Sequence, residues 1–378
     1  MLPSYTVHLL NILLHTYRTM AKSFLPTIFE HPYEIDPKYG KSVAYFCMEY
    51  AIDNSFKIYS GGLGYLAGSH MRSAHDLRQN LVGVGILWSY GYYNQIRAED
   101  GSMATQYMRK NYPFLEDHNI KFLIHVCGAP VWVKAYFLNP ETFGTAPMFF
   151  LSTDLEENDE ESRNISRRLY DANGFTRIAQ YVLLGKGGAR LFDELGIEPE
   201  IYHLNEAHGL AAAFHVLAKT GSVEEVRKRF VFTTHTPEEA GNEKMDVNTM
   251  NTFSFFDGLS MEQVRAAVGL TDNTFNYTLA ALRLCKERGV RTIGIVNVVG
   301  SSIAREADAT MYTWAGPEIS VATTKAYSTQ LAACYLLATE FARVRGTLAD
   351  GRYEHLVTEL EALPEKIEKT LADKERIQ

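Results

Sequence analysis

The chain has 378 residues, of which 46% are hydrophobic, 12% aromatic and 22% charged. This length accommodates two or more domains, and the composition is that of a folded protein. The formal net charge is −8 and lysine and arginine form no cluster, which argues against a nucleic-acid-binding function. Cys47, Cys127, Cys285 and Cys334 are widely separated, which indicates neither a paired metal site nor a disulfide-rich secreted domain. We therefore expect a cytoplasmic protein that binds no metal.

The first 38 residues form an N-terminal extension in this interpretation. Its apolar start is interrupted by His8, Asn11 and His15 and has no cationic segment before it, so it does not resemble a signal peptide. No uninterrupted apolar run in the chain is long enough to span a membrane, and we expect no membrane partner.

Strand-like and helix-like segments alternate after this extension, which is typical of an α/β protein. In chain order we expect a strand at 42–50, a glycine turn opening a helix at 60–77, and strands at 131–138 and 148–154. A solvated acidic loop or helix start at 154–162 and a helix at 178–184 follow. Further on we expect strands at 201–205, 230–236, 291–299 and 309–315, and helices at 206–219, 260–270, 277–289, 301–308 and 323–342. The amphipathic tail is broken at Pro364.

The sequence SGGLG, residues 60–64, follows the first strand region and opens a helix. Gly61, Gly62 and Gly64 allow a ligand to approach the backbone, and free N–H groups at a helix start attract phosphate. A glycine turn that only allows close packing is equally compatible with this pattern.

Polar residues follow two later strands, in HLNEAH (203–208) and TTHTP (233–237). Ligands of open α/β sheets bind at this edge, where Asn205, Glu206, His208 and His235 offer hydrogen bonds suited to sugar hydroxyls. Structural alternatives remain: Asn205 can cap the following helix, His208 can be a core residue whose hydrogen bonds are satisfied, and His235 can bond to nearby backbone. Two such strand ends together with a glycine loop favour a binding site.

Five segments resemble the N-terminal half of the α-glucan (glycogen, maltodextrin) phosphorylases. They are YFCMEYAIDNSFKIYSGGLGYLAG, GVGILWSYGYYNQ, TAPMFFLSTD, IYHLNEAHGLAAAF and FVFTTHTPEEAGNE, and the resemblance covers about residues 33–284. It implies a Rossmann-like domain of the GT-B type. In this family two such domains transfer a glucosyl unit from an α-1,4-glucan to phosphate, giving glucose 1-phosphate, with pyridoxal phosphate as cofactor.

The resemblance also implies roles for particular residues. Gly61, Gly62, Leu63 and Gly64 match the loop whose amides face phosphate groups, and His235 matches a histidine near the 6-hydroxyl of the sugar. Asn205, Glu206 and His208 match the glucose pocket, although many relatives have Asp in place of Glu206.

The family motif E-A-S-G-T-x-N-x-K, which carries the cofactor lysine, does not occur in these 378 residues. We therefore expect no bound pyridoxal phosphate, an incomplete active site and no phosphorolysis.

The segment from Cys285 to Ala338 resembles a different family, the sugar isomerase (SIS) domain of glutamine–fructose-6-phosphate aminotransferase; the resemblance covers about residues 278–341. It implies a truncated, flavodoxin-like phosphosugar-binding unit, with Val321 and Thr323 at positions that contact the sugar phosphate. Residues 323–325 suit helix capping equally well, and Lys325 is interpreted as a surface residue at the helix start. The phosphate loops C-G-T-S and S-Q-S-G-E-T of that family do not occur here.

These resemblances predict a phosphorylase N-terminal domain at 39–284 and a partial SIS domain with a helical tail at 285–378. The two meet in a helix, within the segment TLAALRL (278–284), which suits either family and suggests a chimera formed by recombination or an assembly error. Besides phosphorylase, two functions stay open: an aminotransferase (isomerising) fragment and a non-enzymatic glucan or phosphosugar binder. The expected partners are α-glucan, phosphate, glucose 1-phosphate or a phosphosugar. Both parent families are oligomeric.

Overall fold

The computed structural model describes residues 31–235, 242–286, 291–317, 324–349 and 351–372. The chain divides into two compact units, Met1–His235 with Asn242–Arg288 and Thr236–Gly241 with Gly289–Gln378. The described residues of both units contain helices and strands, so the mixed α/β class expected from the sequence is confirmed.

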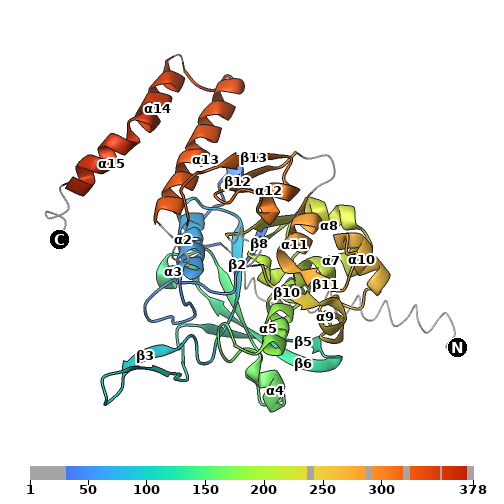
Figure 1. Ribbon diagram of the computed structural model, residues 1–378. Coiled ribbons are helices and arrows are strands. Elements are labelled where there is room, and N and C mark those ends of the chain that lie inside the picture. Colours follow the sequence, from blue (N-terminus) through green and yellow to red (C-terminus); the bar gives the residue numbers. More distant parts are fainter. Residues whose placement is uncertain (1–30, 236–241, 287–290, 318–323, 350, 373–378) are drawn as a thin grey trace. The chain divides into compact units, whose positions relative to one another are not determined.

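A seven-stranded sheet forms the centre of the first unit, in the order β5-β6-β7-β2-β1-β8-β9 (Figure 1). The strands β7, β2, β1, β8 and β9 are parallel, whereas β6 is antiparallel to β7 and forms an edge hairpin with β5. Their bounds are β1 (Val43–Phe46), β2 (Leu81–Ile86), β5 (Glu116–Val126), β6 (Ala129–Leu138), β7 (Met148–Ser152), β8 (Ile201–Asn205) and β9 (Phe230–Thr233). Every residue of β2 and β7 is buried, as expected for strands that are covered on both faces.

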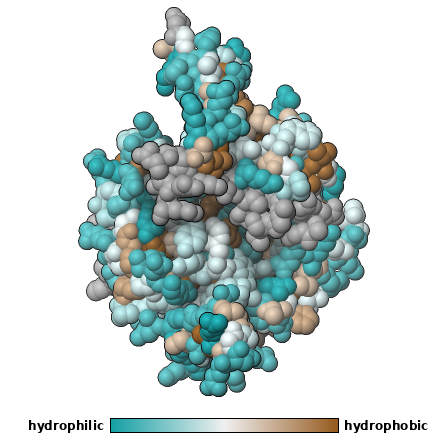
Figure 2. All heavy atoms as spheres, turned by 60° about the vertical axis from the view of Figure 1, so that its left-hand side comes forward, coloured by the Kyte–Doolittle hydropathy of each residue, from teal (hydrophilic) through white to brown (hydrophobic). Residues whose placement is uncertain are grey.

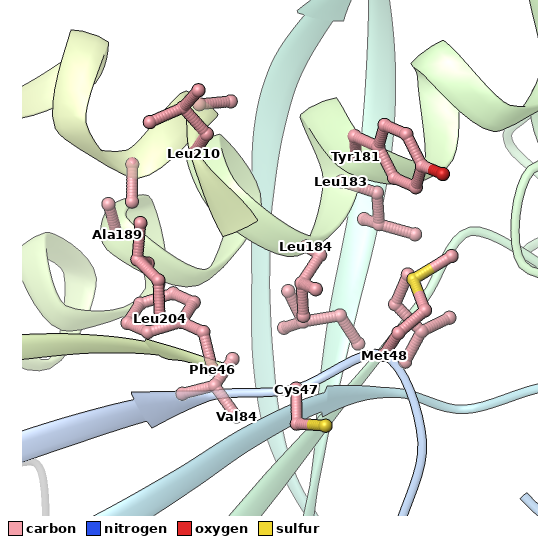
Figure 3. Packing of buried hydrophobic residues seen from close by; sticks show 14 of the residues in the cluster. Phe46, Cys47, Met48, Val84, Tyr181, Leu183, Leu184, Ala189, Leu204 and Leu210 are labelled. Carbon is pink, nitrogen blue, oxygen red and sulfur yellow. The ribbon is translucent and has the colours of Figure 1, made fainter. Parts of the chain in front are cut away.

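Helices cover both faces of this sheet. Gly83 of β2 lies against Met71 of α2 (Gly62–Asp76), and the next residue, Val84, lies against Gly188 of α6 (Gly188–Leu195). Successive strand residues point to opposite faces, so α2 and α6 pack on opposite sides of the sheet. Figure 3 shows the α6 side, where strand and helix residues interdigitate: Phe46, Val84, Leu204, Leu184, Ala189 and Leu210.

The remaining elements of the first unit surround this core. The helical ones are η1 (Pro37–Tyr39), α3 (Pro140–Phe143), α4 (Glu160–Asn164), α5 (Gly174–Val182), η2 (Leu183–Gly187), η3 (Ala207–Gly209), α7 (Ala211–Thr220), α8 (Val223–Arg229), α9 (Val247–Thr252), α10 (Met261–Val268) and α11 (Tyr277–Cys285). Two small antiparallel pairs are β3 (Asn94–Arg97) with β4 (Met103–Gln106) and β10 (Lys244–Asp246) with β11 (Thr274–Asn276).

Several expected boundaries were wrong. The strand expected at 42–50 ends at Phe46, because the chain leaves the ladder there and Glu49 turns toward the glycine loop. The helix expected at 178–184 is the middle of a longer one that begins after the cap residue Asn173, includes the π-helical turn η2 and ends at Leu195. The helix expected to begin at Glu206 begins at Ala211, after η3.

The second unit contains a parallel pair, β12 (Ile293–Val296) and β13 (Ala309–Tyr312), connected by α12 (Ser302–Glu306). The helices α13 (Thr324–Val344), α14 (Arg352–Glu361) and α15 (Leu363–Ala372) follow. The predicted break in the tail is confirmed, because α15 begins one residue before Pro364.

The face drawn in Figure 2 is mostly hydrophilic where residues are coloured, with small separate hydrophobic patches. Among the helices of the described ranges, none is long and apolar enough to cross a membrane.

Candidate functional site

The predicted glycine loop lies at the start of α2, which has Gly61 at its N-cap and no side-chain cap. The backbone N–H groups of Ser60 and Gly61 donate to Oε2 of Glu49, at 2.5 and 3.1 Å. Two amides of this loop are therefore bound to a carboxylate of the chain itself, while those of Gly62, Leu63 and Gly64 lie in the first turn of the helix, where N–H groups have no partner within the helix.

Glu49 is only 2% exposed and follows β1. The Tyr170 hydroxyl donates to its other oxygen, Oε1, at 2.7 Å. A Cβ atom at Gly64 would lie 2.9 Å from Oε2 of Glu49 and 2.7 Å from Cβ of Tyr59. Glycine at this position therefore allows the helix start to approach the carboxylate, which is a structural role for a predicted site residue.

The ends of β8 and β9 bring three predicted site residues together. Oδ1 of Asn205 lies 3.0 Å from Nε2 of His235. The backbone N–H of His235 donates to Oε1 of Glu206 at 2.5 Å, and the Thr234 hydroxyl donates to Oε2 at 3.0 Å. Asn205 is 1% exposed, whereas His235 is exposed, so the cluster extends from the core to the surface.

The backbone of Glu206 has φ +63°, a conformation that costs energy for a residue with a side chain. Its N–H donates to the Thr233 carbonyl at 2.8 Å, which holds this turn against β9. The Asn205 side chain does not cap a helix, because its amide nitrogen contacts the Cys47 sulfur at 3.4 Å and its oxygen contacts His235.

His208 lies between two tyrosines, with ring centroids 6.2 Å from Tyr170 and 5.2 Å from Tyr181. Burial lowers the pKa of His208, although Glu206, Glu243 and Glu49 act in the opposite direction. Its Nδ1 atom is buried and has no hydrogen-bond partner within the described ranges. A neutral imidazole with an unused ring nitrogen can accept from or donate to a hydroxyl group.

The structure thus places the predicted first-unit residues at the carboxyl ends of β1, β8 and β9. Tyr170 connects the two groups, because it donates to Glu49 and its ring neighbours His208. Val321 and Thr323, predicted in the second unit, lie outside the described residues. Within the part of the chain that the structure describes, no group of three or more His, Cys, Asp or Glu residues could hold a metal ion.

The sequence interpretation missed Glu49, Tyr170 and Glu243. Glu243 accepts hydrogen bonds from Tyr181 at 2.7 Å and Arg177 at 3.0 Å, next to His208. Glu49 had a detectable signal, since a charged residue within the apolar run YFCMEY is rarely buried without partners. The partners of Tyr170 and Glu243 are distant in the sequence and left no comparable pattern.

Comparisons with known proteins find different relatives for different parts of the chain. An uncharacterized protein of Methanocaldococcus jannaschii is 48% identical over 246 residues, which covers 65% of this chain and 46% of that protein. The maltodextrin phosphorylase of Thermococcus litoralis is 35% identical over 268 residues, covering 65% of this chain and 31% of the phosphorylase. The chain thus spans less than half the length of these relatives.

The second kind of relative is the glutamine–fructose-6-phosphate aminotransferase (isomerizing) of Caldanaerobacter subterraneus, which is 38% identical over 167 residues. This match covers 41% of the chain and 28% of the aminotransferase. The family model of the SIS domain matches residues 260–340. Because 65% and 41% together exceed the whole chain, the phosphorylase and aminotransferase matches share a segment. The chain therefore combines a phosphorylase-like part with an SIS-like part.

Proposed function

We propose that the first unit binds the glucosyl end of an α-glucan at the carboxyl edge of its sheet, as the Rossmann-like, GT-B-type N-terminal half of a glucan phosphorylase. The cluster of Asn205, Glu206 and His235 carries this proposal. An amide, a carboxylate and an imidazole supply both donors and acceptors, which sugar hydroxyls require. Relatives named maltodextrin and glycogen phosphorylase support the choice of ligand.

In this proposal His235 donates to a hydroxyl near the 6-position, because it is exposed while its ring is oriented by buried Asn205. Glu206 accepts from a second hydroxyl, and the unused Nδ1 of His208 pairs with a third or with an ordered water. The amides of Gly62, Leu63 and Gly64 remain for a phosphate group, since Ser60 and Gly61 donate to Glu49.

Pyridoxal phosphate, the cofactor of the phosphorylase family, does not fit the residues that the structure describes at this edge. The carboxylate of Glu49 accepts from two loop amides and places a negative charge at the loop. The amides of Ser60 and Gly61 are therefore unavailable to the cofactor phosphate, and the motif E-A-S-G-T-x-N-x-K, whose lysine forms the Schiff base, does not occur in the sequence. The absence of a bound cofactor and of turnover by this chain alone stays a prediction.

Calorimetric titration with maltoheptaose tests the proposal. We expect the wild-type chain to bind the sugar, and His235→Ala and Asn205→Ala to weaken binding by about tenfold each, because each removes a hydrogen bond to the ligand or its support. His125→Ala is the matched control, since His125 is exposed on the edge strand β5. Absence of binding, or equal binding by all variants, would refute the proposal.

A second function is favoured by the SIS match at 260–340, namely phosphosugar binding by the second unit. Val321 and Thr323 are the residues proposed to contact the phosphate, at the position just before α13. Titration with fructose 6-phosphate checks this function: Thr323→Val should abolish binding, while Thr329→Val, one turn and a half into α13, should leave it unchanged.

A further inference from the structure

A polar hollow of about 320 Å³ lies where β2 and β7 end, at the carboxyl edge of the sheet. Its lining includes Tyr90, Arg109, Asp154, Glu160, Arg163 and Arg167. None of the residues assigned to the proposed sugar site lines it. Its volume is at the small end of the range for ligand sites, which suits a small molecule better than a polymer.

Asp154 holds two of the three arginines. Its Oδ2 accepts from Arg109 at 2.6 Å, and its Oδ1 accepts from Nε and Nη2 of Arg163 at 3.1 and 2.9 Å. The Asp154 side chain is only 12% exposed, so this shared carboxylate fixes both guanidinium groups at the wall of the hollow. One negative charge thus supports two positive charges.

The third arginine, Arg167, differs from the other two because Asp154 does not neutralise its charge. Its guanidinium carbon lies 4.9 Å from the centroid of the Tyr90 ring, and one nitrogen donates to Oδ1 of Asn164 at 3.0 Å. Its Nε atom is buried and lacks a hydrogen-bond partner, and it forms no ion pair with any carboxylate of the described residues. An arginine stacked on an aromatic ring keeps the edge of its guanidinium available for planar recognition of an oxyanion.

We propose that this hollow is a binding site for a phosphate-type oxyanion, either inorganic phosphate or the phosphate group of a sugar monoester. Three guanidinium groups face two carboxylates, Asp154 and the exposed Glu160, so the lining has an excess of positive charge. This excess is concentrated at Arg167, where a buried donor also needs an acceptor. The inference does not depend on the proposed sugar site.

Calorimetric titration of the full chain with inorganic phosphate, at constant ionic strength set with sodium chloride, tests the inference. Arg167→Gln should weaken phosphate binding by at least about tenfold, because it removes a charge-assisted hydrogen bond. Glu160→Gln should strengthen binding severalfold, because it removes a negative charge that repels phosphate from the rim of the hollow. Arg167→Lys, which keeps the charge but loses stacking and the planar fork, should give an intermediate affinity.

Two controls assign the effect to the hollow. Arg97→Gln removes the same charge from an exposed position of β3, and His235→Ala alters the strand-end cluster, so neither should change phosphate affinity. Titration with glucose 1-phosphate separates the two sources of phosphate. Affinity well above that for phosphate, and dependent on Arg167, identifies a sugar monoester; equal affinities identify free phosphate.

Three results would overturn the inference. One is phosphate binding that Arg167→Gln and Glu160→Gln leave unchanged. Another is binding lost in His235→Ala but kept in the arginine variants, which would place the phosphate at the strand-end cluster. The third is binding of glucose that depends on Arg167 without any binding of phosphate, which would make the hollow a neutral sugar site.

Discussion

Glu49 places a carboxylate in the interior of the first unit, where an unpartnered charge would be strongly unfavourable. Its oxygens instead accept from Ser60, Gly61 and Tyr170, and these bonds join β1, the start of α2 and the segment before α5. A charged acceptor makes stronger hydrogen bonds than a neutral one. Glu49 therefore positions the glycine loop without itself needing to contact a ligand.

Glu49→Gln should reduce the free energy of unfolding by about 1.5–3 kcal/mol, because an amide is a weaker acceptor and brings two N–H donors into a place that offers only donors. Urea denaturation measures the change. Glu156→Gln, at an exposed position, is the matched control and should change stability by less than about 0.5 kcal/mol. Equal effects of the two substitutions would show that Glu49 does not hold the loop.

His203 makes stability depend on pH. Burial, with smaller contributions from His70 and His235, lowers the pKa of His203 to about 4. The folded chain keeps this histidine neutral, while the unfolded chain takes up a proton below its ordinary pKa of 6.5. The stability present above pH 6.5 is therefore lost as the pH falls toward about 4. As the pH falls from 6.5 to about 4, the free energy of unfolding of the wild type should decrease more than that of His203→Gln, which has no titrating group at this position. Parallel curves would contradict this assignment.

Helix α2, which begins at the glycine loop, packs closely against the segment that follows β1. A Cβ atom at Gly68 would lie 2.2 Å from the Ala51 carbonyl oxygen, far inside contact distance. Gly68→Ala should therefore push α2 away from this segment and destabilise the first unit by about 1–3 kcal/mol or more. Gly174→Ala in α5 is the control, because its Cβ atom would make an ordinary contact of 3.7 Å with Met245. Thermal denaturation of the two variants should differ clearly, and similar midpoints would contradict the close packing.

Most strands of the large sheet could be predicted from the sequence, but the details of the turns and the long-range contacts could not. The strands β7, β8 and β9 were expected from their apolar residues, and the contact between Asn205 and His235 follows from the rule that parallel strands end at one edge. The positive φ of Glu206 was not expected, because the hydrogen bonds that hold this turn join Glu206 to Thr233, Thr234 and His235, which are distant in the sequence. Tyr170 lies 121 residues from Glu49 in the sequence, and such pairing leaves no local pattern.

The two units of the molecule differ in the size of their sheets. The first has seven strands, whereas the described residues of the second have only the parallel pair β12 and β13. A two-stranded sheet is marginally stable on its own. Amides of β12 and β13 should therefore exchange with deuterium at least about a hundredfold faster than those of β1 and β2. Comparable protection in both sheets would show that the second unit is as stable as the first.

The boundary between the two kinds of sequence does not follow the boundary between the units. The SIS match begins at residue 260 and so includes α10 and α11, yet both helices belong to the first unit. Buried Val264, Ala281 and Leu284 pack there as part of its core. A helix with an apolar face can serve either family, so local pattern alone does not decide which core it joins.

Hydrogen–deuterium exchange of the full chain, with and without maltoheptaose, tests the central claim most directly. We predict that the sugar slows exchange in two segments, around Asn205 to His208 and at His235. In His235→Ala, the same degree of protection should require about tenfold more sugar. Protection elsewhere, or no protection at any sugar concentration, would show that the strand-end cluster is not a sugar site.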